Sequence, residues 1–226
     1  MQPRVLRPNT LDSLVTAKMA ADVYHAREYV DGNGWVLDIG ANIGAFCLHV
    51  KSFCPQVQIL CVEPMPSNLE TLRSNVEGHA IVIPAALVGS AGSVTMYDFG
   101  PSYSGCHSMY HLNVPGSIPV QVTGVTLAQL LSMHNISLVQ FLKLDCQGAE
   151  YDVIPSLDET TLDRIDFIAL EVHYRIAAGD TFLGEIPDQR TKAKAMFSKL
   201  QQTHRLIHGR LEDSDIEQVW QNKRLS

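Results

Sequence analysis

The sequence predicts an α/β fold in which helices cover both faces of a doubly wound, mostly parallel β-sheet. Short apolar runs alternate with helical patterns along most of the chain, as βαβ units with right-handed crossovers require. Two of these runs, WVLDIGANIG and FLKLDCQGAE, end in an acidic residue that is followed by a glycine turn and a helix start. The 226 residues, 46% hydrophobic and 18% charged, can bury the core of one such domain.

The first third of the chain should hold a helix followed by two strand–helix units. Apolar residues keep a helical period from Leu11 to Val30, so one helix is expected from Asn9 or Thr10 to about Tyr29. The turn DGNG at 31–34 ends this N-terminal helical extension, 1–34, and the main domain is expected at 35–226. The next elements are expected to be strand Trp35–Ile39, helix Gly44–Phe53, strand Val57–Val62 and helix Ser67–Val76.

The remaining elements follow from the same patterns of apolar residues and turn signals. Strands are expected at His79–Pro84, Val94–Phe99, Val120–Val125, Leu138–Leu144 and Ile165–Val172, and helices at Leu127–Met133 and Arg190–Thr203. Arg205–His208 and Ile216–Trp220 are candidates for a closing hairpin. The twenty residues Gly100–Pro119 carry no element, and stretches of this length often form functional lids, so we expect a mobile cover or a plain surface excursion.

The glycine turn after the first strand reads D-x-G-x-N-x-G, from Asp38 to Gly44. Gly40 and Gly44 let the backbone turn sharply and approach a ligand, which then meets the N-terminus of the following helix. A dinucleotide fingerprint needs glycine where this chain has Asn42, so a nicotinamide oxidoreductase is disfavoured. Asp38 would repel a phosphate but suits a cation. An ordinary strand–turn–helix without a ligand remains the alternative.

Residues after the second and third strands complete a candidate nucleotide site. Glu63 ends the second strand about 20 residues beyond the turn, where a carboxylate accepts hydrogen bonds from ribose hydroxyls. The alternative is a carboxylate that only faces a helix dipole. Pro64 and Met65 could lie against an adenine ring, although Met is usually packing material. Ala86, after the third strand, is also assigned to cofactor binding.

Asp38, Glu63, Asp145 and Glu171 all lie at or near carboxyl ends of predicted strands, where ligands of such sheets bind. Like charges held close together need a cation to relieve them. Asp145 and Glu171 should end neighbouring strands and are candidate magnesium ligands. His173 could accept a proton near neutral pH, so Asp145 and His173 are the candidate catalytic residues.

Other histidines are weaker candidates for the base or for a metal site. His107 and His111 are rival bases in the loop. His204 and His208 have i, i+4 spacing, but they lie in a predicted strand and should not meet, so we discount a metal site there. His49 is expected to belong to the core.

Charge and cysteine content limit the partners and the setting. The net charge of −7 argues against a nucleic-acid partner. Five cysteines without C-x-x-C spacing indicate reduced thiols and a cytoplasmic location. The N-terminus MQPRVLRPNT has no apolar signal-peptide core, and no apolar run is long enough to span a membrane.

VLDIGANIGAFCLHV, VEPMPSNLETLRSNV, VTLAQLL, FLKLDCQGAEYDVI and IDFIALEVH, in this order, resemble the FkbM family of S-adenosylmethionine (SAM)-dependent methyltransferases. The D-x-x-G-A-E segment from Asp145 to Glu150 is the most discriminating of these motifs, although Cys146 and Gln147 depart from its commoner filling. The resemblance implies a Rossmann-like, class I methyltransferase fold with an antiparallel terminal strand. It implies SAM as cofactor, methyl transfer to a hydroxyl of a small molecule, natural product or sugar, and magnesium in some members. The alternative is a non-catalytic SAM-binding or scaffold protein.

Overall fold

A computed structural model describes residues 1–225 except 113, 174, 179–180 and 212–216, and only the backbone of 175–178 and 181. Its α-helices are α1 Asp12–Ala20, α2 Ala26–Tyr29, α3 Ala45–Phe53, α4 Pro66–Asn75, α5 Leu127–Met133, α6 Glu150–Ser156, α7 Glu159–Leu162 and α8 Gln189–Thr203. Its strands are β1 Trp35–Ile39, β2 Gln58–Val62, β3 Ile81–Ile83, β4 Ala86–Leu87, β5 Gly92–Asp98, β6 Ile118–Val125, β7 Val139–Leu144, β8 Ile165–Glu171, β9 Arg175–Ala178, β10 Thr181–Glu185, β11 His204–His208 and β12 Glu217–Asn222. Short 3₁₀ turns lie at Pro101–Tyr103 and Lys223–Leu225.

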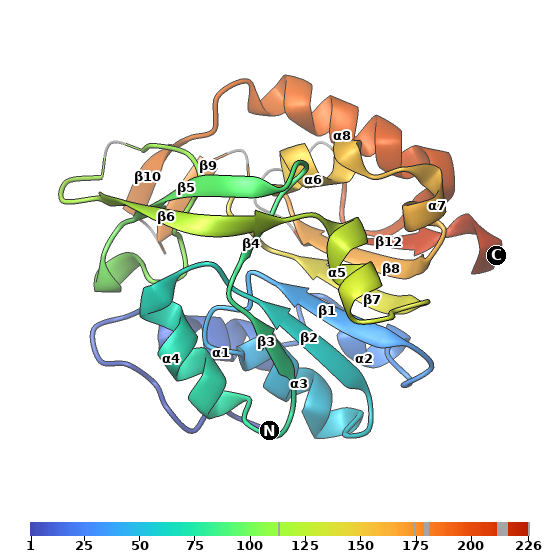
Figure 1. Ribbon diagram of the computed structural model, residues 1–226, viewed down its shortest axis with the longest axis horizontal. Coiled ribbons are helices and arrows are strands. Elements are labelled where there is room, and N and C mark those ends of the chain that lie inside the picture. The colour runs from blue at the N-terminus through green and yellow to red at the C-terminus, as the bar shows by residue number, and fades with distance from the viewer. Residues whose placement is uncertain (113, 174, 179–180, 212–216, 226) are drawn as a thin grey trace.

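The central sheet has seven strands in the order β11-β12-β8-β7-β1-β2-β3 (Figure 1). The strands from β3 to β8 pair in parallel, and β12 is antiparallel to both β8 and β11. The predicted doubly wound, mostly parallel sheet is therefore confirmed, as is the closing hairpin. The antiparallel strand, last in the chain, lies inside the sheet between β8 and β11. Ile216, in the predicted last strand, lies outside the described residues.

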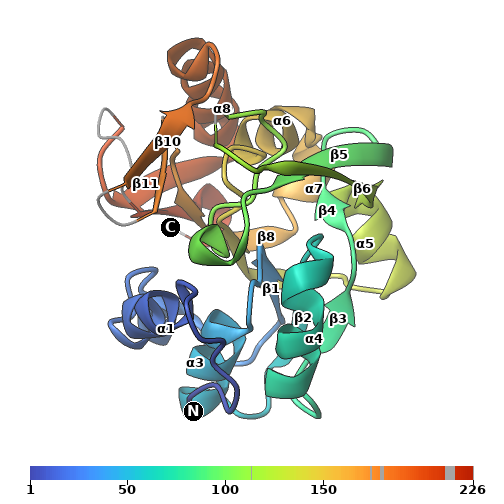
Figure 2. The ribbon, with the colours of Figure 1, turned by 90° about the vertical axis from the view of Figure 1, so that its left-hand side faces the viewer.

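Each face of the sheet has its own apolar core, because neighbouring residues of a strand point to opposite faces. In β1, Leu37 and Ile39 pack with residues of α5, α6 and α8. Val36 packs on the other face with residues of α1, α3 and α4. Figure 1 shows α3 and α4 on one side of the sheet and α6 and α8 on the other, and Figure 2 shows the small sheet β4-β6-β5 and helix α1 on opposite sides of β1.

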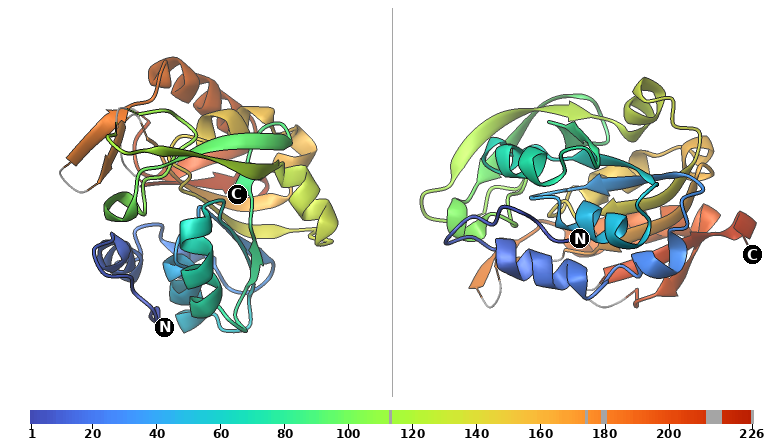
Figure 3. Two further views of the ribbon diagram at one scale, coloured as in Figure 1. Left: turned by 60° about the vertical axis from the view of Figure 1, so that its left-hand side comes forward. Right: turned by 90° about the horizontal axis from the view of Figure 1, so that it is seen from below.

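The single N-terminal helix expected up to Tyr29 is wrong, because the chain breaks between α1 and α2. Asp22 and His25 both have a left-handed φ, of 55° and 54°. The Asp22 carboxylate accepts hydrogen bonds from the backbone N–H groups of Ala26 and Arg27, at 3.0 and 3.2 Å. This capping starts a new short helix, and the right-hand view of Figure 3 shows α1 and α2 following one another along the same side of the molecule.

Several smaller elements were not expected from the sequence: strand β4, helix α7 and the hairpin β9–β10. The predicted strand at Val94–Phe99 is β5, which pairs antiparallel with β6 in the small second sheet. Among the described residues, no helix is long and apolar enough to cross a membrane.

Candidate functional site

The carboxyl ends of the central strands meet along one edge of the sheet. Parallel pairing sets Ile39 of β1 beside Val62 of β2 and Leu144 of β7, and Leu144 beside Leu170 of β8. The residues that follow these ends are therefore neighbours on that edge: Gly40, Glu63, Asp145 and Glu171. The expectation that Asp145 and Glu171 end neighbouring strands is confirmed.

The glycine turn is shaped by contacts that only glycine permits. Gly40 has φ 73°, and a Cβ there would lie 1.9 Å from the carbonyl oxygen of Asp145. Gly44 has φ 83°, and its Cβ would lie 2.4 Å from Val76 Cγ1. Asn42 also has a left-handed φ, of 49°, which asparagine tolerates better than most residues. The turn is thus packed directly against the end of β7.

Glu63 joins this turn to the end of β2. Its Oε2 accepts from the backbone N–H of Asn42 at 2.9 Å, and its Oε1 accepts from Met65 N–H and Asn68 Nδ2 at 3.0 and 3.1 Å. Burial raises the pKa of the Glu63 carboxyl, although these donors oppose the rise. A carboxylate has about four acceptor sites, so Oε2 keeps room for one hydroxyl of a ligand.

A pocket opens between the glycine turn, the end of β2 and the loop after β5, with an empty volume of about 880 Å³ that includes its open mouth. Most predicted cofactor residues line it: Gly40, Asn42, Glu63, Pro64, Met65 and Ala86. Val88, Met96 and Met109 add apolar walls, and Lys143 and Asp145 add charge. Apolar walls around a few polar groups are typical of a small-molecule site.

Asp38 does not line this pocket. It is fully buried, and pairing of β1 with β7 sets it opposite Lys143, so both side chains point to the same face of the sheet. Lys143 Nζ lies 3.1 Å from Asp38 Oδ1 and donates to the carbonyl oxygen of Gly40 at 2.9 Å. Asp38 thus holds Lys143 beneath the glycine turn. Gly44 does not line the pocket either, and it contributes through the shape of the turn.

Two donors from the N-terminal segment reach this edge: Tyr24 contacts both Asp145 and Glu171, and Lys18 contacts Glu171. The hydroxyl of Tyr24 lies 3.0 Å from Asp145 Oδ2 and 3.2 Å from Glu171 Oε2. Lys18 Nζ lies 2.6 Å from Glu171 Oε2 and 2.7 Å from Glu217 Oε1. Burial alone would raise the pKa of Asp145, but the positive charges of Lys143 and His173 outweigh it and lower that pKa. Burial and the nearby Asp145 charge raise the pKa of Glu171.

His173 lies behind this pair and is held by Glu150. Its Nδ1 is 2.7 Å from Glu150 Oε1, and its Nε2 is 3.7 Å from one oxygen each of Asp145 and Glu171. Burial disfavours the charged ring, but the Glu150 carboxylate and the two strand-end carboxylates outweigh burial and raise the pKa of His173 to about 10. The ring is therefore protonated at neutral pH and does not line the pocket, so the expected role as a base near neutrality does not fit its surroundings.

His107 lines the pocket, but its ring is not placed to accept a proton. Nδ1 accepts the backbone N–H of Phe99 at 3.1 Å, so a neutral ring presents Nε2–H, which is a donor. Burial lowers the pKa of His107, which favours that neutral form. The other rival, His111, is exposed and does not line the pocket.

The loop at 100–119 covers one side of the pocket through Ser104, Gly105, His107 and Met109, and its expected mobility stays a prediction. It is anchored to the rest of the domain. Ser108 is fully buried, and its hydroxyl donates to the carbonyl oxygen of Gln147 at 2.7 Å. The Asn68 side chain donates to the carbonyl oxygen of Ser104 at 3.3 Å.

Asp145, Glu171 and His173 also form a group that could hold a metal ion, because one ligand atom of each lies within 4.8 Å of the others. Two carboxylates and an imidazole are suitable donors for a divalent cation. The ammonium of Lys18 now neutralises Glu171, so an ion in this group would have to displace it.

Sequence reasoning gave no role to Lys18, Tyr24, Lys143 or Glu150. The sequence does point to Lys143, because a lone lysine in the apolar strand FLKL requires a buried partner. Glu150 was noted only as the end of a motif. Lys18 and Tyr24 had no local signal, because their partners lie more than a hundred residues away along the chain.

Comparison with known proteins identifies relatives of this chain. Residues 38–202 match the profile of the methyltransferase FkbM domain. Methyltransferase 1 of Beauveria bassiana is 28% identical over 186 residues, which cover 69% of this chain and 75% of that protein. The 31-O-demethyl-FK506 methyltransferase FkbM of Streptomyces tacrolimicus is 26% identical over 168 residues, which cover 61% of this chain and 65% of that protein.

Among solved structures, a putative caffeoyl-CoA O-methyltransferase from Staphylococcus aureus has a TM-score of 0.48 and 11% identity, covering 98% of this chain and 86% of that chain. This likeness is too low to support an argument. The fold assignment follows from the strand order and the family match.

Proposed function

The chain belongs to the FkbM family of methyltransferases, and from this premise we propose that it is an O-methyltransferase that moves the methyl group of SAM to a hydroxyl of a small molecule. The observation that carries the proposal is Asp145. Asp145 lines the pocket at the end of β7, beside the glycine turn, and Glu171 ends the neighbouring strand. The name of the Streptomyces relative also specifies an O-demethyl compound.

The pocket fits the chemistry of SAM. Glu63 has acceptor capacity left for a ribose hydroxyl, and Pro64, Met65 and Ala86 offer apolar surface for a purine ring. When bound, SAM supplies an electrophilic methyl group on a sulfonium. We assign Gly40, Asn42 and Gly44 to shaping the turn beside it, and Asp38 to fixing that turn through Lys143.

Methyl transfer forms a C–O bond and breaks a C–S bond, so the acceptor hydroxyl must lose its proton. We assign that proton to Asp145, which is ionised because its pKa is lowered and which lines the pocket. His173 acts as a positioning residue: held by Glu150, it places a positive charge 3.7 Å from Asp145 Oδ1. Tyr24 orients the other carboxylate oxygen.

Metal assistance is a second route to the same deprotonation. Asp145, Glu171 and His173 would hold the cation, and a divalent ion such as Mg²⁺ would acidify the hydroxyl. In the alternative without metal, the ammonium of Lys18 supplies the positive charge beside Glu171. Activity that is lost with a chelator and restored by Mg²⁺ would favour the metal, and unchanged activity would favour Lys18.

The acceptor is proposed to be a small molecule and not a nucleic acid, because the chain carries a net charge of −7. The absence of disulfides among the described residues agrees with a cytoplasmic setting, which we retain as part of the proposal.

The test compares wild type with Asp145→Asn and Glu63→Gln, using calorimetry with S-adenosylhomocysteine and labelled SAM with a panel of hydroxylated macrolides and sugars. Asp145→Asn should bind S-adenosylhomocysteine as wild type does but lose about 10²- to 10⁴-fold in turnover. Glu63→Gln should weaken binding instead. Full turnover by Asp145→Asn would refute the assignment of the base. Binding without any methylated product would favour the alternative, a non-catalytic SAM-binding protein.

A further inference from the structure

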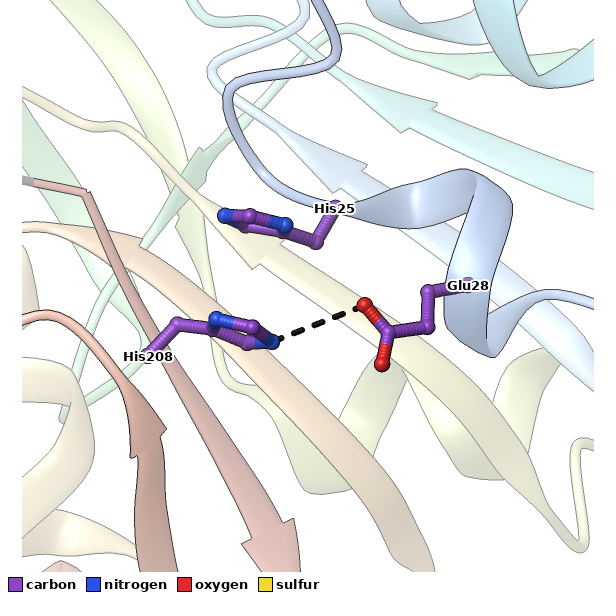
Figure 4. A group of neighbouring side chains, drawn as sticks. All are labelled: His25, Glu28 and His208. Atoms are coloured by element: carbon purple, nitrogen blue, oxygen red, sulfur yellow. Dashed lines mark ion pairs between the residues drawn. The ribbon is translucent and has the colours of Figure 1, made fainter.

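A second group of ligating side chains lies outside the pocket. His25, Glu28 and His208 each offer one ligand atom, and these atoms lie within 4.8 Å of one another (Figure 4). Glu28 Oε2 is 3.6 Å from His208 Nε2. The two imidazole rings are stacked, with centroids 3.9 Å apart and an interplanar angle of 9°. None of the three residues lines the pocket described above.

The fold brings these residues together from both ends of the chain. His25 is the residue that precedes α2, Glu28 lies within α2, and His208 is the last residue of β11. The i, i+4 partner considered in the sequence, His204, is fully buried and its Nε2 lies 3.1 Å from the carbonyl oxygen of Ile165. It therefore faces away, and His208 meets His25 instead.

We propose that His25, Glu28 and His208 bind a zinc ion. Two imidazoles and one carboxylate are the donors of many zinc sites that keep an open fourth position, and Zn²⁺ places tetrahedral ligand atoms about 3.3 Å apart. The Glu28–His208 distance of 3.6 Å is close to that value. The lone pairs of two parallel rings cannot meet at one ion, so one imidazole has to turn out of the stack. Glu28 is exposed and both histidines are half-buried, which leaves room for this rotation and for water in the fourth position.

Tyr29 contacts two of the proposed ligands without being one of them. Its hydroxyl donates to Glu28 Oε1 at 2.9 Å and lies 2.7 Å from His208 Nε2. Its ring is stacked on Phe167 of β8, with centroids 4.5 Å apart, so the hydroxyl has a fixed position. The hydrogen bond to Glu28 orients that carboxylate, as groups around metal ligands commonly do, whereas zinc has to displace the hydroxyl from His208 Nε2.

Zinc bound here would join α2 to β11, and thus the N-terminal segment to the C-terminal hairpin. His25 directly follows Tyr24, whose hydroxyl faces Asp145 and Glu171. The ion would therefore hold the segment that delivers Tyr24 to the proposed active site. Zinc binding at this site does not depend on the proposed methyltransferase function.

The test measures zinc affinity of the full chain after chelator treatment, by equilibrium dialysis, and the visible absorption of Co²⁺ as a probe of tetrahedral coordination. His208→Gln and His25→Gln should each weaken Zn²⁺ binding by more than about 100-fold and abolish the cobalt signal. His79→Gln, at a half-buried histidine elsewhere, is the matched control and should bind as wild type.

His173→Gln distinguishes this site from the group in the pocket. Zinc affinity that survives His173→Gln but not His208→Gln supports the proposal. Unchanged affinity in both His25→Gln and His208→Gln, or loss confined to His173→Gln, would overturn it. Thermal melts without metal show whether each variant is folded, and His25→Gln, on a partly exposed turn, gives an independent answer if His208→Gln is not.

Discussion

Replacing Lys143 by methionine should expose how strongly the buried ion pair beneath the glycine turn depends on its cation. Lys143 is 3% exposed and Asp38 is fully buried, and the Lys143 ammonium lies 3.1 Å from Asp38 Oδ1. The substitution leaves Asp38 without its cation, and removing one partner of a buried pair costs about 3–5 kcal/mol. For a chain of this size, about 2–4 °C per kcal/mol corresponds to a fall in Tm of about 6 to 20 °C.

The loss should depend on pH in a defined direction. Burial raises the pKa of Asp38, and Lys143 is the group that opposes this rise, so Lys143→Met raises that pKa further. A carboxyl whose pKa is raised by folding holds its proton in the native state while the unfolded state releases it, so stability falls as pH rises above about 4. Urea unfolding at several pH values should therefore show a deficit that grows toward neutral pH.

Asp38→Asn in the Lys143→Met background is the decisive control, because it removes the stranded charge. It should recover part of the lost stability and flatten the pH dependence of the remaining deficit. A deficit below about 1 kcal/mol at pH 7, or one that is the same at every pH and is not relieved by Asp38→Asn, would refute this account of the pair.

Two further predictions test the turn and the buried histidine. Gly40→Ala should abolish S-adenosylhomocysteine binding in calorimetry, because its Cβ would lie 1.9 Å from the Asp145 carbonyl oxygen. Gly78→Ala, which has a similar φ and open space around its Cβ, should lose only about 1–2 kcal/mol of folding stability and keep binding. Equal effects of the two substitutions would contradict the steric argument. The pKa of His173, raised to about 10, contributes folding stability that is full below about pH 6.5 and is lost as pH rises toward 10. Urea unfolding should show this decline in wild type and a smaller decline in Glu150→Gln. Identical pH profiles of the two proteins would contradict the role of Glu150.

The sheet and the position of its ligand edge could be predicted because both follow from local patterns. Apolar runs that end in Asp145 and Glu171 fixed the strand ends, and parallel pairing then made these residues neighbours. The break between α1 and α2 was not predictable in the same way. No glycine or proline marks it, and the capping by Asp22 competes with a helical period that is otherwise continuous.

The charge state of the site also lay beyond local patterns. His173 was expected to titrate near neutrality, as an isolated histidine does. Glu150 is buried and lies 2.7 Å from its Nδ1, and this contact raises the pKa of His173 to about 10. The spacing of the motif placed Glu150 on the helix after Asp145 but could not show that the side chain turns toward the end of β8.

The N-terminal segment is better understood as part of the site than as an extension beside it. The family match begins at residue 38, yet Lys18 and Tyr24 supply the cation and the hydroxyl that contact Glu171 and Asp145. Without them the two carboxylates would share one sheet edge with only His173 and Lys143 as nearby cations, and mutual repulsion would disfavour their ionised forms. Since α1 and α2 pack on the same face of the sheet as Asp38 and Lys143, the same packing that buries this face brings Lys18 and Tyr24 to the carboxylates. The proposed proton transfer at Asp145 should therefore depend on how firmly α1 and α2 are held, which would link the proposed zinc site on His25 to the proposed catalysis without any shared ligand.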